Sequence, residues 1–177
     1  MYIAATSGLT TIGLDVKAVA RTHGADLQQH SLLPPQVLAL TRHWLALSGK
    51  TGGGKTPPAA AQFEMMDVGD IVPYLTILRV NPDNTFTFTF TGSAVSAIIG
   101  EDLTGRTVTA GQAVLGEIDW FRRCRPVAEV ADIQVLAGAI SPSHTSPIDF
   151  IAADFPLMDD AGGAVTEIVG VTVARLN

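Results

Sequence analysis

The chain has 177 residues, enough for one well-buried core and too few for two ordinary domains. Hydrophobic residues make up 47% of it and charged residues only 16%, which argues against general disorder. A formal net charge of −6 disfavours nucleic acid or anionic lipid as a partner, and no stretch approaches the roughly 20 apolar residues that span a bilayer. We therefore expect neither nucleic-acid nor membrane binding.

Residues 1–30 show no sustained hydrophobic period, and we expect them to form a flexible N-terminal extension before a single domain at 31–177. They lack the basic start of a signal peptide, and Asp15 and Lys17 interrupt their apolar stretch. Cys124 is the only cysteine and cannot form an internal disulfide, so nothing here depends on an oxidising compartment. These features favour a cytoplasmic location.

A first helix is predicted from Pro34 and Pro35 to about Ser48, where apolar side chains recur at spacings of three and four. The following GKTGGGKT matches the G-x-x-x-x-G-K-[ST] phosphate-binding loop. Such a loop needs a buried strand before it and a helix after it, whereas here a helix precedes it and Pro57 and Pro58 follow it. We therefore interpret residues 49–57 as a Gly-rich connecting loop, with Gly49 ending the helix.

The segment AQFEMMDVGDIVPYL predicts a short helix or turn with three apolar side chains directed inward: Phe63, Met66 and Ile71. Strands are then predicted at YLTILRV and TFTFTFT, joined by an NPDN turn. The strict alternation of TFTFTFT places four threonines on one face and three aromatic side chains on the other: Phe86, Phe88 and Phe90. This pattern predicts a hairpin with one apolar face.

After short helices and loops, a further helix is predicted from Ala110 to Arg125, with Pro126 ending it. Strands are predicted at VAEVADIQVLAGAI, DFIAADFPLM and AVTEIVGVTVARL, and a DDAGG turn joins the last two. The order helix, two strands, helices, three strands predicts an α+β fold. We expect a five-stranded antiparallel sheet with helices over one face, preceded by an N-terminal helix.

The stretch FTFTFTGSAVSAIIGEDLTGR resembles the F-x-Y-R-L-x-G-T…G-x-D-L-T-G-R stretch of a family of small bacterial PAS-domain proteins. Thr89 stands where that family usually has arginine, and the DLTGR segment is the most specific part of the resemblance. The positions that carry the resemblance, within about residues 38–173, are Trp44, Gly92, Gly100, Asp102, Leu103, Thr104, Gly105, Arg106, Pro156 and Leu157.

The resemblance implies a PAS-like sensory or signal-transduction domain that acts through a small ligand, through protein-protein interaction, or through both. Because the chain ends just after its last predicted strand, we expect no attached output domain and a separate signalling protein as partner. The alternative is a small enzyme of the nuclear-transport-factor-like type, which usually has Asp, His or Tyr side chains in its cavity. The inward side chains predicted here are mainly phenylalanines, so we expect no catalytic residue and no metal site. The sequence does not indicate which cofactor, if any, the protein binds.

A pocket for a small apolar ligand between sheet and helices has six candidate residues: Tyr74, Leu78, Phe86, Phe88, Phe90 and Ile168. The alternative is that these side chains simply fill the core. The DLTGR segment is interpreted mainly as a turn in which Asp and Thr cap backbone N–H groups and Gly supplies a positive φ. Leu38 and Leu45 form an apolar strip beside the main helical stripe, which predicts a homodimer unless the core wraps further round this helix.

Three other groupings are weaker candidates. His144 lies near serines and Asp149, but a Ser-His-Asp site also needs an oxyanion hole, so a solvated loop is the better interpretation. His43, on the polar side of its helix, is a weak haem-ligand candidate. The sequence around Cys124 does not match the Asn-Cys-Arg-Phe-Leu-Gln pattern of flavin-binding PAS domains. Neighbouring arginines favour a thiolate there, yet a lone helical cysteine is more often inert.

Overall fold

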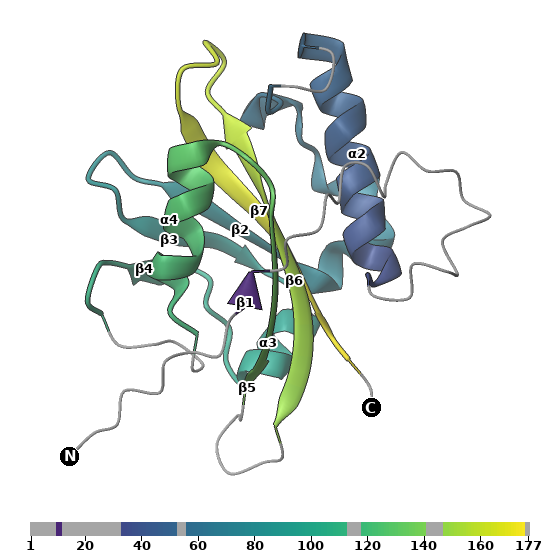
Figure 1. The fold of residues 1–177 in the computed structure, drawn as a ribbon, viewed down its shortest axis with the longest axis vertical. Helices are drawn as coiled ribbons and strands as arrows, with labels where there is room; N and C mark the ends of the chain where they lie inside the picture. The colour runs from purple at the N-terminus through teal and green to yellow at the C-terminus, as the bar shows by residue number, and fades with distance from the viewer. Residues whose placement is uncertain (1–9, 12–32, 53–55, 113–117, 141–146, 176–177) are drawn as a thin grey trace.

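The computed structural model describes residues 10–11, 33–52, 56–112, 118–140 and 147–175. Within these ranges, one antiparallel sheet lies between helices that pack on its two faces (Figure 1). Of the helices described, none is long and apolar enough to cross a membrane.

The helices and strands alternate in blocks along the chain. Helix α2 (Pro35–Gly52) is followed by two 3₁₀ helices, η1 (Ala60–Gln62) and η2 (Met65–Tyr74). Strands β2 (Leu75–Val80) and β3 (Phe86–Thr91) come next, and then helices α3 (Ser93–Ile99) and α4 (Trp120–Val130). The last three strands are β5 (Gln134–Ile140), β6 (Ile148–Met158) and β7 (Val165–Ala174). Strands β1 (Thr10–Thr11) and β4 (Thr107–Val108) have two residues each.

The strands lie in the order β1-β5-β6-β7-β2-β3-β4, and every neighbouring pair is antiparallel. The predicted α+β class is confirmed. The predicted number of five strands is wrong, because the two short strands extend the sheet at its edges. Strand β1 pairs with β5, so Thr10 and Thr11 of the predicted extension join the sheet, while the rest of residues 1–30 lies outside the described residues.

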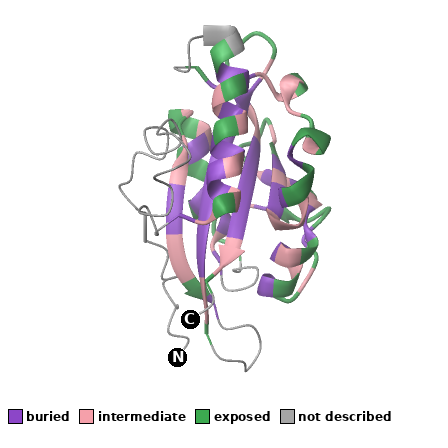
Figure 2. Cartoon of the chain, turned by 90° about the vertical axis from the view of Figure 1, so that its right-hand side faces the viewer, coloured by how far each residue is buried: buried purple, intermediate pink, exposed green. Residues whose placement is uncertain are grey.

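Helices cover both faces of the sheet rather than the single face predicted. Alternate residues of β6 point in opposite directions, and nearly the whole strand is buried (Figure 2). Ile151 and Phe155 belong to the core under α2, whereas Phe150 and Ala152 belong to the core under α3 and α4. A strand that is apolar on both faces, such as FIAADFPL, has to be covered on both sides.

Strand β3 does not keep the alternation predicted from TFTFTFT. Ile77 of β2 pairs with Phe90 and Leu78 pairs with Phe88, so Thr89 is the extra residue of a β-bulge. Phe88 therefore packs under α3 and α4, whereas Phe90 packs against the core under α2. The prediction that the three phenylalanines share one face is wrong for Phe90, because the bulge reverses the two faces after it.

Helix α2 continues to Gly52 and is not stopped at Gly49 as predicted. Glycine weakens a helix without forbidding it, and here the helix extends into the Gly-rich segment. After that segment, Met158 N donates a hydrogen bond to Pro58 O at 2.9 Å, which returns the chain to the end of β6. Helix α2 thus contains the first four residues of GKTGGGKT and prolines follow the motif, so the strand-loop-helix context of a phosphate loop is missing. Lys55 lies outside the described residues.

Helix α4 begins later and ends later than predicted. Asp119 caps its start, because Asp119 Oδ1 accepts a hydrogen bond from Arg122 N at 2.9 Å. The helix continues through Pro126 and ends where Ala131 adopts a left-handed conformation with φ 55°. Proline removes one N–H donor but leaves the rest of this short helix intact, so the predicted strand starts only at Gln134.

Candidate functional site

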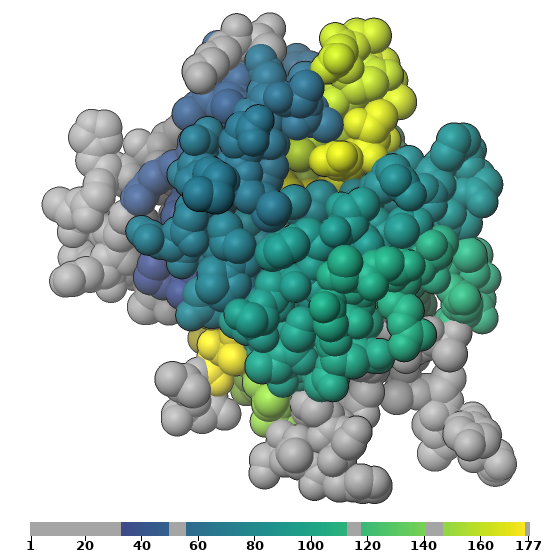
Figure 3. Space-filling view, turned by 180° about the vertical axis from the view of Figure 1, so that it is seen from behind, coloured from purple at the N-terminus to yellow at the C-terminus, as the bar shows by residue number. Residues whose placement is uncertain are grey.

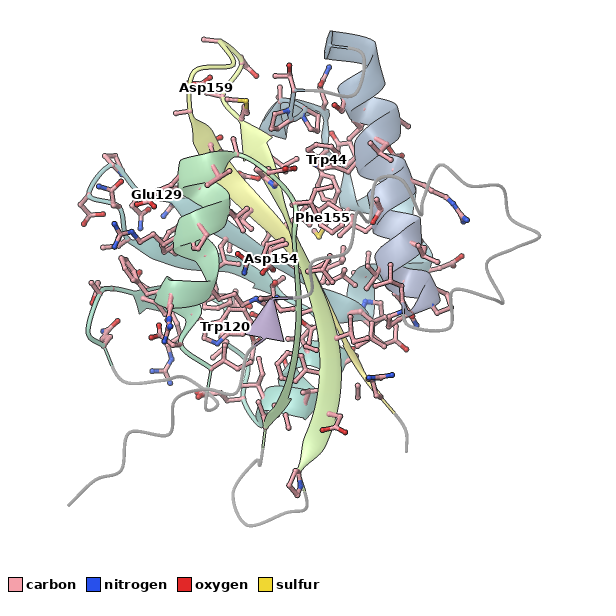
Figure 4. The ribbon with its side chains drawn as sticks, viewed as in Figure 1. Trp44, Trp120, Glu129, Asp154, Phe155 and Asp159 are labelled. Atoms are coloured by element: carbon pink, nitrogen blue, oxygen red, sulfur yellow. The ribbon has the colours of Figure 1, made fainter. Side chains whose placement is uncertain are left out.

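A buried ion pair joins helix α4 to the centre of the sheet. Arg123 Nε and Nη2 donate to Asp154 Oδ2 and Oδ1, both at 2.7 Å. The two side chains are 0% and 1% exposed. Arg123 Nη2 also lies 3.5 Å from Thr172 Oγ1 of β7. Figure 4 shows Asp154 on the side of α4, whereas its neighbour Phe155 lies toward Trp44 and α2. The pair therefore fixes α4 against the two central strands.

The inner face of α4 explains how an arginine reaches this position. Trp120, Arg123 and Val127 recur at spacings of three and four and are all buried. The guanidinium carbon of Arg123 lies 4.5 Å from the centre of the Trp120 ring, within range of a cation–π interaction. Burial acts to lower the pKa of Arg123, but the charge and hydrogen bonds of Asp154 outweigh it and raise the pKa above its ordinary value. The arginine is therefore always charged.

A glycine makes room for this polar cluster. A Cβ atom at Gly170 of β7 would lie 2.6 Å from Thr76 Oγ1 and 2.7 Å from Asp154 Oδ1, which is too close for any side chain. Thr76 Oγ1 and Arg123 Nη1 are buried, and neither has a hydrogen-bond partner in the part of the chain that the structure describes. An unpaired buried polar group costs about 1–3 kcal/mol. The cluster of Thr76, Arg123, Asp154, Gly170 and Thr172 thus has unused hydrogen-bonding capacity inside an otherwise apolar layer.

The sequence patterns did not reveal this cluster. Asp154 is the only charged residue in the run FIAADFPLM, on a strand that is buried on both faces. Arg123 lies in the basic run RRCR, and a run of this kind normally indicates a solvent-exposed surface. The helical spacing of Trp120, Arg123 and Val127 was the one available indication that this arginine faces inward.

Cys124 is a buried neutral thiol. It is 0% exposed, and burial raises the pKa of the thiol well above its ordinary value. Asp154 raises this pKa further, and Arg123 lowers it only in part. The expectation that the neighbouring arginines favour a thiolate is wrong, because Arg123 is neutralised by Asp154 while Arg122 and Arg125 point to solvent. The inert interpretation of Cys124 fits this environment.

The six predicted pocket residues do not line one pocket. Four of them are buried under α3 and α4, namely Leu78, Phe86, Phe88 and Ile168, whereas Tyr74 and Phe90 pack against the core under α2. The rings of Phe86 and Phe121 are 5.6 Å apart, and those of Phe88 and Trp120 are 4.9 Å apart. Aromatic side chains therefore fill space next to the polar cluster.

The DLTGR segment forms a turn beside β3, in agreement with its structural interpretation. Asp102 Oδ1 accepts a hydrogen bond from Thr104 N at 2.9 Å, and this bond lowers the pKa of Asp102. Gly105 has a φ of 85° and donates its N–H to Phe88 O at 2.8 Å. Arg106 is exposed and pairs with Glu101 at 3.1 Å rather than with a backbone carbonyl. Leu103 fixes the turn to the core and is 0% exposed.

The other positions of the resemblance also have structural roles. Trp44 Nε1 donates to Pro156 O at 2.8 Å, which ties α2 to β6, and Leu157 is buried in the same core. A Cβ atom at Gly92 would lie 2.4 Å from Pro73 O, so only glycine fits there. Gly100 ends α3 in a left-handed conformation.

The predicted dimer strip on α2 is not exposed. Leu38 is 4% exposed, and Leu45 is half-buried against the same core. The core wraps further round the helix, which was the alternative interpretation. Leu38 therefore belongs to the core, and the homodimer contact through Leu38 and Leu45 stays a prediction that the structure does not support.

An open groove of about 440 Å³ lies between α2 and η2. Ala39 and His43 of α2 line one side, and residues 66–71 of η2 line the other. The ring of His43 packs edge-on against Phe63 at 5.7 Å. Met66 is 86% exposed rather than directed inward as predicted, because η2 buries Val68 and Ile71 instead.

The remaining candidates gain no chemistry from the structure. Ser143, His144 and Ser146 lie outside the described residues. Among the residues that are described, no three His, Cys, Asp or Glu side chains are grouped closely enough to hold a metal ion. A comparison of the chain with models of protein families found no match, and neither did a comparison with curated proteins.

Proposed function

We propose that the chain is a PAS-like signal-transduction domain whose sensing element is helix α4 with the buried Arg123–Asp154 pair. The polar cluster at the base of α4 carries this proposal. It is fully buried, it joins the helix to the central strands, and it retains two unpaired polar atoms, Arg123 Nη1 and Thr76 Oγ1.

A buried ion pair usually contributes little to the free energy of unfolding of a domain. Replacing such a pair by apolar side chains of similar volume is often neutral or stabilising, whereas removing one partner is costly. The pair at Arg123 and Asp154 therefore suits an element with two states, paired and unpaired, better than a purely structural contact. This supports a role for α4 as the part of the domain that changes position.

A small polar molecule is the ligand that fits this arrangement best. It would bind the free N–H groups of Arg123 Nη1 and the hydroxyl of Thr76, and compete with Asp154 for the guanidinium. The ligand is thus polar, unlike the apolar ligand expected from the phenylalanines. Displacement of Arg123 would move α4, whose outer face is exposed to a signalling protein at Arg122 and Arg125.

The alternative of a small cavity enzyme draws no support from the cluster. Asp154 is the one inward carboxylate there, and it already accepts two hydrogen bonds from Arg123. A general base needs a carboxylate that is free to reach a substrate proton. The sensor proposal therefore accounts better for the paired geometry.

The test combines native mass spectrometry with hydrogen exchange. The wild type, the double variant Arg123→Met, Asp154→Leu and the control Arg125→Met, an exposed arginine on the same helix, are each incubated with a small-molecule cell extract. We expect a bound small molecule and altered amide exchange in α4 for the wild type and the control, and neither for the double variant. A wild type that binds nothing and shows unchanged exchange in α4 would refute the proposal.

A further inference from the structure

Two large hydrophobic side chains are exposed in the described part of the chain, and their surroundings differ in charge. Met66 of η2 is 86% exposed, and Val130 at the end of α4 is 71% exposed. Met66 lies at the groove between α2 and η2. Val130 lies on the outer face of α4. Neither side chain contributes to a core, so each is available for a partner.

The groove combines an apolar floor with an acidic rim. Val68 and Ile71 are buried beneath it, while Asp67 and Asp70 line it and are exposed. Neither aspartate forms an ion pair with any residue the structure describes. At neutral pH the groove therefore presents two unpaired negative charges beside the exposed Met66.

The outer face of α4 has the opposite charge. Arg122, Arg125, Pro126 and Val130 are all exposed, and their spacings of three and four place them on one side of the helix. Arg125 pairs with Glu129 at 2.6 Å, whereas Arg122 forms no ion pair within the described ranges. In a chain of net charge −6, RRCR is the one locally basic stretch. The apolar pair Pro126 and Val130 thus lies beside unpaired positive charge.

We infer that a second copy of this chain occupies the groove, and that it docks through the outer face of its α4. Val130 and Pro126 of one copy pack on Met66 and the apolar floor of the next copy. Arg122 then faces Asp67 and Asp70, which gives the contact its charge complementarity. The inference involves no atom of the buried polar cluster, although it assigns to a second copy the α4 face that the sensor proposal offers to a signalling protein.

The positions of the two surfaces determine the kind of assembly. Helix α4 lies in front of the sheet in Figure 1, whereas the surface of residues 60–74 faces the viewer from behind in Figure 3. One copy therefore offers its α4 face to one neighbour and its groove to another, which is a head-to-tail contact. Because the contact joins one helix face to one groove, we expect weak association that grows with concentration.

The test is a complementation experiment by sedimentation velocity, from micromolar to millimolar protein at about 0.15 M salt, where charges beyond roughly 8 Å are screened. A groove variant carries Asp67→Lys and Asp70→Lys, and a face variant carries Arg122→Glu and Val130→Glu. Controls with a single charge reversal of the same sign at an exposed site elsewhere are Asp160→Lys and Arg175→Glu. Circular dichroism verifies that each variant is folded. Met66→Gln for the groove and Val130→Gln for the α4 face are milder substitutions, each made singly.

We expect the wild type and both controls to form species larger than a dimer as concentration rises, while each surface variant alone stays monomeric. An equimolar mixture of the two surface variants should form a dimer and nothing larger, because only one intact groove can meet one intact α4 face. A wild type that is monomeric at every concentration overturns the inference. So does a mixture that stays monomeric, or a surface variant that associates as the wild type does.

Discussion

Breaking the Arg123–Asp154 pair from either side should destabilise the protein. In Asp154→Leu, the arginine stays charged in a site where it is 0% exposed, and removal of one partner from such a pair costs about 3–5 kcal/mol. Arginine cannot release its proton at any accessible pH. We therefore expect the loss in Asp154→Leu to be the same at pH 7 and pH 5.

In Arg123→Met, the carboxylate of Asp154 loses both hydrogen bonds from the guanidinium in a site where it is 1% exposed. Removal of this partner should also cost about 3–5 kcal/mol.

Urea titrations at the two pH values measure these differences. The double variant Arg123→Met, Asp154→Leu should lie within about 1–2 kcal/mol of the wild type at both, since an apolar pair replaces an ionic one. Single losses below about 1 kcal/mol would show that the pair is solvated and would refute the argument.

Three other predictions concern single positions. Gly92→Ala should cost about 3 kcal/mol or more in thermal or urea unfolding, because its Cβ would meet Pro73 O at 2.4 Å, and a normal stability would show that this turn relaxes freely. Phe88→Ala should cost about 3–5 kcal/mol, whereas Thr89→Ala at the exposed bulge should cost less than about 1 kcal/mol; equal losses in urea would contradict the described burial. Because burial raises the pKa of Cys124, only the unfolded chain loses the thiol proton above about pH 8.5, so stability should fall by about 1.4 kcal/mol per pH unit. A Cys124→Ala variant that shows the same fall in alkaline urea titrations would contradict this.

Local patterns predicted most of the long elements, because the physics behind them is local. The alternating TFTFTFT with its NPDN turn, and the strands around DDAGG, form the hairpins that their turn residues favour. The bulge at Thr89 was not predictable in this way, since the alternation of residue types continues through it without a break. It arises from the pairing register with β2, which is set by contacts outside the strand.

The candidate site was less accessible to sequence reasoning than the fold. Arg123 and Asp154 are 31 positions apart, and nothing in either segment indicates that the two meet. The layer of helices on the second face was also missed, although the apolar run of β6 on both sides of Asp154 required it. Met66 shows the converse case, because an apolar residue type led to an inward prediction while the side chain lies at a surface groove.

The pairing of β2 with β7 has a consequence for how the chain is made. Leu75 pairs with Val171, so the early hairpin of β2 and β3 keeps one open edge until the last described strand has left the ribosome. An open apolar edge can recruit strands from other chains during this interval. Nascent chains that stall before residue 165 should therefore depend on chaperones, whereas completed chains close this edge themselves.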